Sequence, residues 1–251
     1  MVDGLRAAIT FLTRVPVGDC DADVAAAPPW FPFVGALVGA LVGLVFVGAW
    51  PLVAPALAAV LAVATGALVT GAFHYDGLAD MADAFGGGWS PAQRLEILKD
   101  SRHGTYGVMA IVLVVVAQVI ALATLGPAQG FAALVAAHTL GRAGAVVLMM
   151  SLPIARPDGL GADYTERLRR GNAIGGIVVG ALLATIAMGW WVMPAIAAVA
   201  VTTVAVGVLA HRKIGGIVGD VLGAAEQMGE TVVLIVAAAV THRHGAWPWW
   251  R

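Results

Sequence analysis

Seven long apolar runs occupy most of this 251-residue chain and limit what it can fold into. Each has about 20 residues, the length that a helix needs to cross the hydrocarbon core of a bilayer. Backbone N–H and C=O groups in lipid must be paired within the segment, so we expect every run to be a helix. The runs lie at about 33–50, 53–73, 107–126, 131–150, 173–191, 194–210 and 216–240.

The composition also favours a membrane location. Charged residues make up 12% of the chain, whereas a soluble domain carries about 25%. We therefore predict an all-α, polytopic integral membrane bundle, with residues 1–251 forming one membrane-embedded domain. The bundle has six or seven transmembrane helices, because the last run is apolar only in its second half. It has a helical loop on the cytoplasmic side.

Basic residues are distributed unevenly between the two ends of the predicted spans. If the N-terminus is cytoplasmic, most of the 14 Lys and Arg residues face the cytoplasm, as the positive-inside rule requires. The long connections lie on that side, and loops on a rigid scaffold commonly carry function. We therefore expect a functional site at the cytoplasmic face, in segments 74–106, 151–172 and 211–230. The basic residues that this orientation places on the cytoplasmic side are Arg6, Arg14, Arg94, Lys99, Arg102, Arg156, Arg167, Arg169, Arg170, Arg212 and Lys213.

Charge and cysteine content narrow the classes of function. The formal net charge is -1, so nothing indicates binding to nucleic acid. Cys20 is the single cysteine, which excludes an intramolecular disulfide and a cysteine-based metal site. The glycine-rich spans favour close helix packing and permit copies of the chain to associate as a homo-oligomer.

Three aspartates, Asp76, Asp80 and Asp83, follow His74 at positions i, i+4 and i+7. On a helix they fall within about 60° of one another. Like charges this close repel unless a cation lies among them, and hard oxygen ligands suit Mg²⁺, Mn²⁺ or Ca²⁺. The alternatives are an acidic helix face in contact with water and an acid that caps the start of a helix. We predict that these aspartates bind a metal ion.

A polar segment from Lys99 to Gly107 precedes the third run. Lys99 and Arg102 are suited to holding phosphate oxygens, and Asp100 can add a metal ligand. The alternative is a basic anchor for lipid headgroups. Upstream, Ser90 is followed by a proline and, three residues on, by a glutamine, which predicts a short capped helix to about residue 99.

Acidic residues also occur within the last apolar run, at Asp220, Glu226 and Glu230. A charge inside a bilayer costs about 2.5–3.5 kcal/mol on insertion scales and is functional by default. The alternative is burial against Arg142 or another cation. Arg142 follows His138 by one helical turn, and the two are either a structural pair or part of a pocket.

Taken in order, these motifs resemble those of the cobalamin synthase family, the adenosylcobinamide-GDP ribazoletransferases. Two departures are His103, where an aliphatic residue is expected, and Asp158, where Glu is more usual. The blocks that carry the resemblance lie at 11–17, 31–35, 74–83, 99–107, 155–161 and 215–230.

The resemblance implies a magnesium-dependent phosphoryl transfer at the cytoplasmic membrane. Adenosylcobinamide-GDP would react with α-ribazole or its 5'-phosphate, giving adenosylcobalamin or its 5'-phosphate and GMP. The resemblance and the spacing of the motifs together suggest catalytic roles for His74, Asp76, Asp80, Asp83, Lys99 and Arg102. The general base would be one of the carboxylates or His74. The expected magnesium ligands are Asp76, Asp80, Asp83 and Asp100. The expected substrate contacts are Gly104, Thr105, Arg156, Gly216, Asp220 and Glu226.

Two other functions fit part of the pattern. A CDP-alcohol phosphotransferase also uses spaced aspartates in a membrane helix, and residues 76–79 match the start of its motif, but Asp80 stands where that family has Arg. A cation transporter would carry its acids near span centres, whereas the clearest acidic cluster lies at a span end.

Overall fold

The computed structural model describes residues 2–18, 26–100, 102–156, 164–165 and 168–245. Cys20, Arg167 and residues 157–161 of the resemblance lie outside these ranges. The described residues form helices and no strand. The helices are α1 (Val2–Leu12), η2 (Pro28–Trp30), α2 (Phe31–Ala49), α3 (Pro55–Thr70), α4 (Phe73–Gly87), α5 (Pro91–Ile97), α6 (Thr105–Ala123), α7 (Pro127–Ser151), α9 (Arg170–Met188), η3 (Gly189–Trp191), α10 (Val192–Ile214) and α11 (Gly219–His244).

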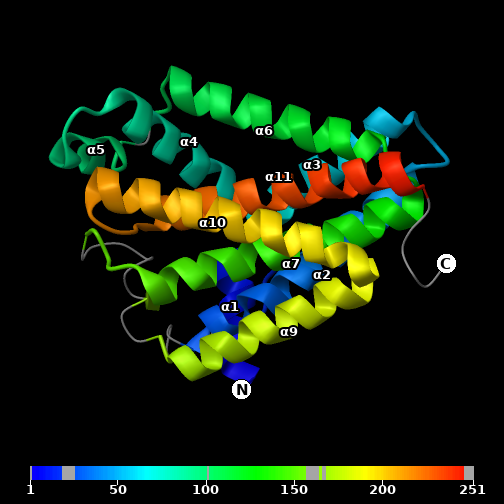
Figure 1. Ribbon diagram of the computed structural model, residues 1–251, viewed down its shortest axis with the longest axis horizontal. Helices are drawn as coiled ribbons and strands as arrows, with labels where there is room; N and C mark the ends of the chain where they lie inside the picture. Colours follow the sequence, from blue (N-terminus) through cyan, green and yellow to red (C-terminus); the bar gives the residue numbers. More distant parts are fainter. Residues whose placement is uncertain (1, 19–25, 101, 157–163, 166–167, 246–251) are drawn as a thin grey trace.

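Five stretches of the described chain are long and apolar enough to cross a membrane. One of them, Arg170–Ile214, has 45 residues, which as a straight helix would extend about 68 Å. It contains two helices, α9 and α10, which run in opposite directions and meet at η3 (Figure 1). Counting these two separately gives six spans, and α3 with α4, bent by 91°, would add one more. The prediction of an all-helical membrane bundle is confirmed.

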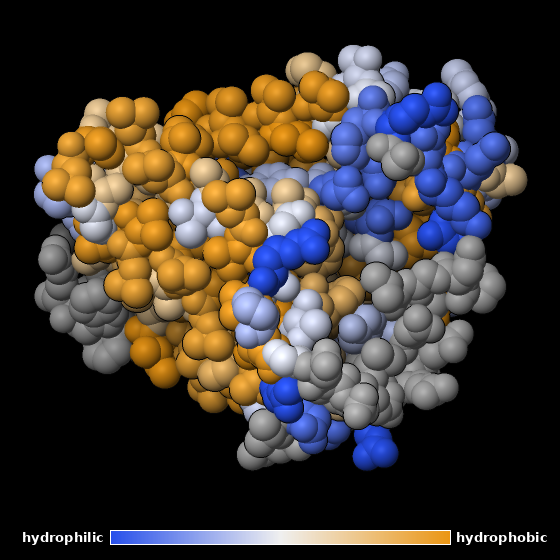
Figure 2. Space-filling model, turned by 180° about the vertical axis from the view of Figure 1, so that it is seen from behind, coloured by the Kyte–Doolittle hydropathy of each residue, from blue (hydrophilic) through white to orange (hydrophobic). Residues whose placement is uncertain are grey.

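The outward faces of the bundle are apolar, as contact with lipid requires. On α6 the exposed residues Met109, Val112, Leu113, Val116 and Ile120 recur at helical spacing. Comparable exposed rows occur on α3, α9 and α10. Figure 2 shows the apolar surface over most of one face, with hydrophilic residues gathered toward one end.

Helix α7 lies at the centre of the bundle, and α2 packs closely along it. Small residues make this approach possible: a Cβ atom added to Gly39 would lie 2.5 Å from the carbonyl oxygen of Leu134. In lipid, such close backbone contact takes the place of the hydrophobic effect as the force that joins helices.

A sharp bend between α3 and α4 turns the acidic helix across the bundle. Gly71 ends α3 with a φ of 67°, and Ala72 follows with a φ of 58°. A left-handed alanine is uncommon because its Cβ crowds the backbone. The bend brings α4 onto the start of α11, where Gly77 faces Asp220 and His74 faces Gly223.

The three segments in which we predicted the site converge at one end of the bundle. Figure 1 places α5, the start of α6, the end of α7 and the end of α10 at its left end. Two contacts join these elements: Arg94 donates to the carbonyl oxygen of Lys213 at 3.1 Å, and Lys213 Nζ donates to that of Phe85 at 3.3 Å. The predicted helix after Ser90 is confirmed, and the Ser90 hydroxyl accepts a hydrogen bond from the backbone amide of Gln93.

We predict that Gly77→Ala destabilises the protein. The added Cβ would lie 2.9 Å from the Asp220 carbonyl oxygen and 3.0 Å from its Cα, and overpacking of this kind costs about 1–3 kcal/mol. The melting temperature of the detergent-solubilised protein measures the effect. The control is Gly87→Ala on the same helix, where the added atom meets nothing within 4 Å. Equal melting temperatures for the two variants would contradict the close packing of α4 on α11.

Candidate functional site

Two of the three predicted aspartates come together with a residue from the following loop. Asp76 and Asp80 lie one turn apart on α4, and the His103 ring lies between them. His103 Nε2 is 3.3 Å from Asp76 Oδ1, and its Nδ1 is 3.3 Å from Asp80 Oδ1. The Asp76 side chain is 60% exposed, whereas that of Asp80 is 13% exposed. The group therefore opens to solvent on the Asp76 side.

These three side chains form a candidate site for a divalent cation. One atom from each of Asp76, Asp80 and His103 lies within 4.8 Å of the other two. Magnesium commonly takes one or two protein carboxylates and completes its shell with water and substrate phosphates. An imidazole nitrogen is more typical of manganese, iron or zinc sites. The residues thus fit a divalent metal, with two oxygen ligands that suit magnesium.

Asp83, the third predicted ligand, is directed to the start of α6. Its carboxylate accepts hydrogen bonds from the backbone amides of Gly104 at 2.6 Å and Gly107 at 2.9 Å. The first amides of a helix lack partners within the helix, and a negative charge near them is favourable. The structure thus gives Asp83 a capping function, and its metal role stays a prediction.

The exposed loop residues are arranged differently from what the sequence suggested. Arg102 binds Asp100 with three side-chain hydrogen bonds of 2.9, 3.3 and 2.7 Å. This contact holds the pKa of the Asp100 carboxyl at about 2. Lys99 and Thr105 are also exposed. Asp100 is therefore not brought into the Asp76 group, although its neighbour His103 is.

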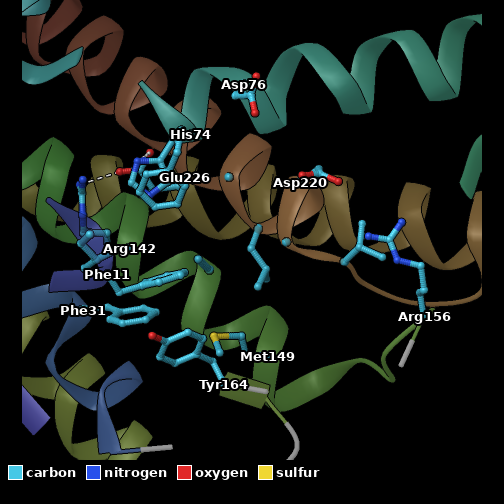
Figure 3. A pocket seen from close by; sticks show the side chains of 17 residues that line it. Phe11, Phe31, His74, Asp76, Arg142, Met149, Arg156, Tyr164, Asp220 and Glu226 are labelled. Carbon is cyan, nitrogen blue, oxygen red and sulfur yellow. Dashed lines mark ion pairs between the residues drawn. The ribbon is translucent and has the colours of Figure 1, made fainter. Parts of the chain in front are cut away.

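A cavity of about 270 Å³ lies beside α4 and gathers five of the predicted site residues (Figure 3). Asp76 stands at one side of it, and His74, on the same helix, faces Glu226 of α11 with Nδ1 and Oε2 3.5 Å apart. The five residues are His74, Asp76, Arg156, Asp220 and Glu226.

Backbone pairing between two loops positions part of this cavity. The Ala155 amide donates to the Ile217 carbonyl oxygen, and the Ile217 amide donates to that of Pro153, both at 2.8 Å. Gly216 is buried in this contact, where a Cβ would clash with Pro153. The pairing fixes Arg156, which follows Ala155, near the start of α11. Gly216 thus has a packing function here, and its predicted substrate contact stays a prediction.

The inner part of the cavity reaches a buried ionic cluster between α7 and α11. Arg142, 1% exposed, forms ion pairs through Nη1 with Glu226 and Glu230. His138 contacts Glu230, and the Gln227 amide donates to both carboxylates, at 3.0 and 3.1 Å. Burial of the two acids against Arg142, the alternative left open by the sequence, is what the structure shows. Glu226 also lines the cavity.

Sequence reasoning missed two parts of the site. His103 drew notice only as a departure from the family pattern. The apolar wall of the cavity, made by Phe11, Phe31, Phe73 and Met149 with Tyr164, was not predicted at all. Its residues come from separate segments, so no local spacing marks them. Phe11 and Phe31 do lie in blocks of the resemblance, which was the one available signal.

We predict that Asp83→Ala lowers stability by about 1 kcal/mol, because two amides of α6 lose their acceptor. Asp83→Asn should lose less, since its side-chain oxygen still accepts one bond. Melting temperatures of the purified variants measure the difference. A loss in Asp83→Ala that is no larger than that in Asp83→Asn would show that the capping bonds do not stabilise the protein.

Comparisons with known proteins identify the family of the chain. The profile of the cobalamin-5-phosphate synthase family matches residues 4–238. The chain is 44% identical to the adenosylcobinamide-GDP ribazoletransferase of Bradyrhizobium diazoefficiens, over 95% of this chain and 94% of the relative. It is 41% identical to that of Azorhizobium caulinodans (91% and 92%) and 36% identical to that of Chlorobaculum tepidum (95% and 96%). No solved structure matches. The chain belongs to the cobalamin-5-phosphate synthase family.

Proposed function

We propose that this chain transfers the adenosylcobinamide-phosphate group of adenosylcobinamide-GDP to α-ribazole or α-ribazole 5'-phosphate, releasing GMP. One observation supports this proposal above the others: Asp76 belongs both to the candidate metal group and to the wall of the cavity. A phosphate at the metal group would thus adjoin a space for a second substrate. The names of the relatives supply the identity of the substrates.

The proposed step breaks a phosphoanhydride bond and forms a phosphoester bond. A ribazole hydroxyl oxygen attacks the phosphorus nearest the cobinamide, and the bond from that phosphorus to the oxygen of GMP breaks. The hydroxyl proton passes to a base, and GMP leaves with the bonding electron pair. Such transfers depend mainly on positioning and on neutralisation of charge.

Asp76 and Asp80 would hold the divalent ion, with His103 beside them. We propose magnesium, because its remaining ligand positions are readily taken by water and by a substrate diphosphate. A bound ion would neutralise charge on the diphosphate. Without an ion, a protonated His103 can bridge the two carboxylates, since each ring nitrogen lies 3.3 Å from one of them. Asp83 and Asp100 would act mainly by shaping α6 and the loop.

His74 is the best placed general base. It is 4% exposed and lines the cavity. Its Nδ1 faces the Glu226 carboxylate, which would hold the proton on that nitrogen and leave Nε2 as the acceptor. In this arrangement Glu226 is a positioning residue, and Arg142 fixes Glu226 in turn.

Basic residues beside the site would bind the charged parts of the substrates. Arg156 lines the cavity. Lys99 and Arg102 lie in the loop that delivers His103, where they can reach an incoming diphosphate. Asp220 at the cavity and Gly104 and Thr105 at the start of α6 would add polar contacts. With these roles, the phosphates of the substrates would lie at the open end of the site.

We further propose that residues 1–251 form one catalytic domain in the cytoplasmic membrane, with the site end facing the cytoplasm. Basic residues concentrate at this end, as the positive-inside rule expects of a cytoplasmic face. The exposed apolar rows would contact membrane lipid, and their small residues would also allow a homo-oligomer. The family match favours ribazole transfer over CDP-alcohol phosphotransfer and cation transport.

The proposed activity predicts two products in equal amounts. Purified protein in detergent, given adenosylcobinamide-GDP, α-ribazole 5'-phosphate and Mg²⁺, should release GMP and form the corrinoid product together. EDTA should stop both, and added Mg²⁺ should restore them. Absence of turnover by protein with a normal melting temperature would argue against the proposal. Turnover that persists in EDTA would show that the reaction does not need the proposed metal ion.

We predict that Asp80→Asn lowers turnover on the order of a hundredfold or more while the protein still folds, because one metal ligand loses its charge. The matched control is Glu96→Gln on α5, where the same change falls on an exposed side chain. The rate of GMP release and the melting temperature are measured for both. Near-normal turnover in Asp80→Asn would refute the metal assignment.

A further inference from the structure

The cavity has two chemically different parts, and the proposed transfer uses only one of them. His74, Asp76, Asp220 and Arg156 line the polar part (Figure 3). The other part is walled by rings centred on Phe11. Its ring lies 5.5 Å from that of Phe31, nearly parallel at 14°, and 4.3 Å from that of Tyr164. Phe73 meets Phe11 edge-on at 5.6 Å.

Arg142 lines this cavity and carries unused hydrogen-bond donors. Its Nη1 serves Glu230 and the His138 carbonyl oxygen. Its Nε and Nη2 are buried and have no hydrogen-bond partner among the described residues. A buried donor without a partner is destabilising. The arrangement therefore favours a ligand that supplies an acceptor at this depth.

We propose that the aromatic part of the cavity binds the benzimidazole base of α-ribazole, with its free ring nitrogen accepting from Arg142. This inference rests on the function proposed above. The base is flat and apolar and has a single free acceptor and no donor. The base therefore matches the aromatic rings on the walls of the cavity and the Arg142 donors that have no partner.

The size of the cavity and the chemistry of its walls argue against the other bases and rings of the two substrates. A volume of about 270 Å³ is near the lower end of the 300–1,000 Å³ range of small-molecule pockets, so it takes one ring system rather than a corrinoid. Guanine would bring several donors and acceptors to a wall formed mainly by Phe11, Phe31 and Met149, which have no polar side-chain atom, and in which Tyr164 offers a single hydroxyl.

The inference also orders the parts of the substrate along the cavity. With the base among the rings, the attached ribose would lie toward His74, the proposed base for its hydroxyl proton. Asp76 follows two residues along the same helix and belongs to the metal group. Base, sugar and phosphate would thus meet the aromatic wall, His74 and the carboxylates in turn.

Filling the cavity tests the proposal. Ala145 lines it from α7 and is buried. We expect Ala145→Leu to weaken binding of α-ribazole about tenfold or more while adenosylcobinamide-GDP binds unchanged. Phe31→Leu, which removes one ring and keeps an apolar side chain, should show the same selective loss. Both affinities are measured by titration calorimetry in Mg²⁺, with one substrate at a time so that no turnover occurs. The matched control is Ala197→Leu at an exposed position of α10.

The outcomes separate this inference from the proposed reaction. Selective loss of α-ribazole binding supports it. An analogue of α-ribazole whose base is unsubstituted benzimidazole needs less space, so a smaller loss of its affinity in Ala145→Leu would support the inference further. Unchanged α-ribazole affinity in folded variants would overturn it, even if wild-type protein releases GMP. A selective loss of adenosylcobinamide-GDP binding would overturn it as well and assign the cavity to that substrate. Selective α-ribazole binding without any turnover would support the binding site and refute the reaction.

Discussion

The ionic cluster around Arg142 sets the arrangement on which the rest of the site depends. Charged groups in the middle of a bilayer are costly, so Arg142, Glu226 and Glu230 are retained only in contact with one another. All three lie on α7 and α11, and removing one would leave the others buried without partners, at about 3–5 kcal/mol. The cluster therefore fixes the register of the two central helices. Asp220 and His74 take their places relative to that register.

Much of the fold could be predicted because its main determinant is local. A run of about 20 apolar residues needs no knowledge of its neighbours to become a helix in lipid. The bend before α4 is different. It depends on a left-handed backbone at Ala72, a residue type that does not favour this conformation. The packing of α4 onto α11 stabilises the bend, and a single sequence gives no sign of that packing.

The same distinction applies to the candidate site. The spacing of Asp76 and Asp80 indicated their pairing because four residues make one helical turn. Asp83 and Asp100 have the same chemistry, but nearby amides and Arg102 engage them in the structure. Those partners come from a loop whose path the sequence does not specify. The aromatic wall was unpredictable for a related reason, since tertiary packing alone brings its rings together.

The bonds from Asp83 to the first turn of α6 also affect how this part of the protein can vary. They tie the end of α4 to the start of α6, so the segment between, residues 88–103, leaves and returns at nearly the same point. A loop with fixed ends can change length at little entropic cost, about 0.6 kcal/mol for each doubling. The carboxylates of α4 are thus insulated from insertions in that loop. A new side chain such as His103 can therefore arise at the end of this segment without displacing the helix that carries the acids.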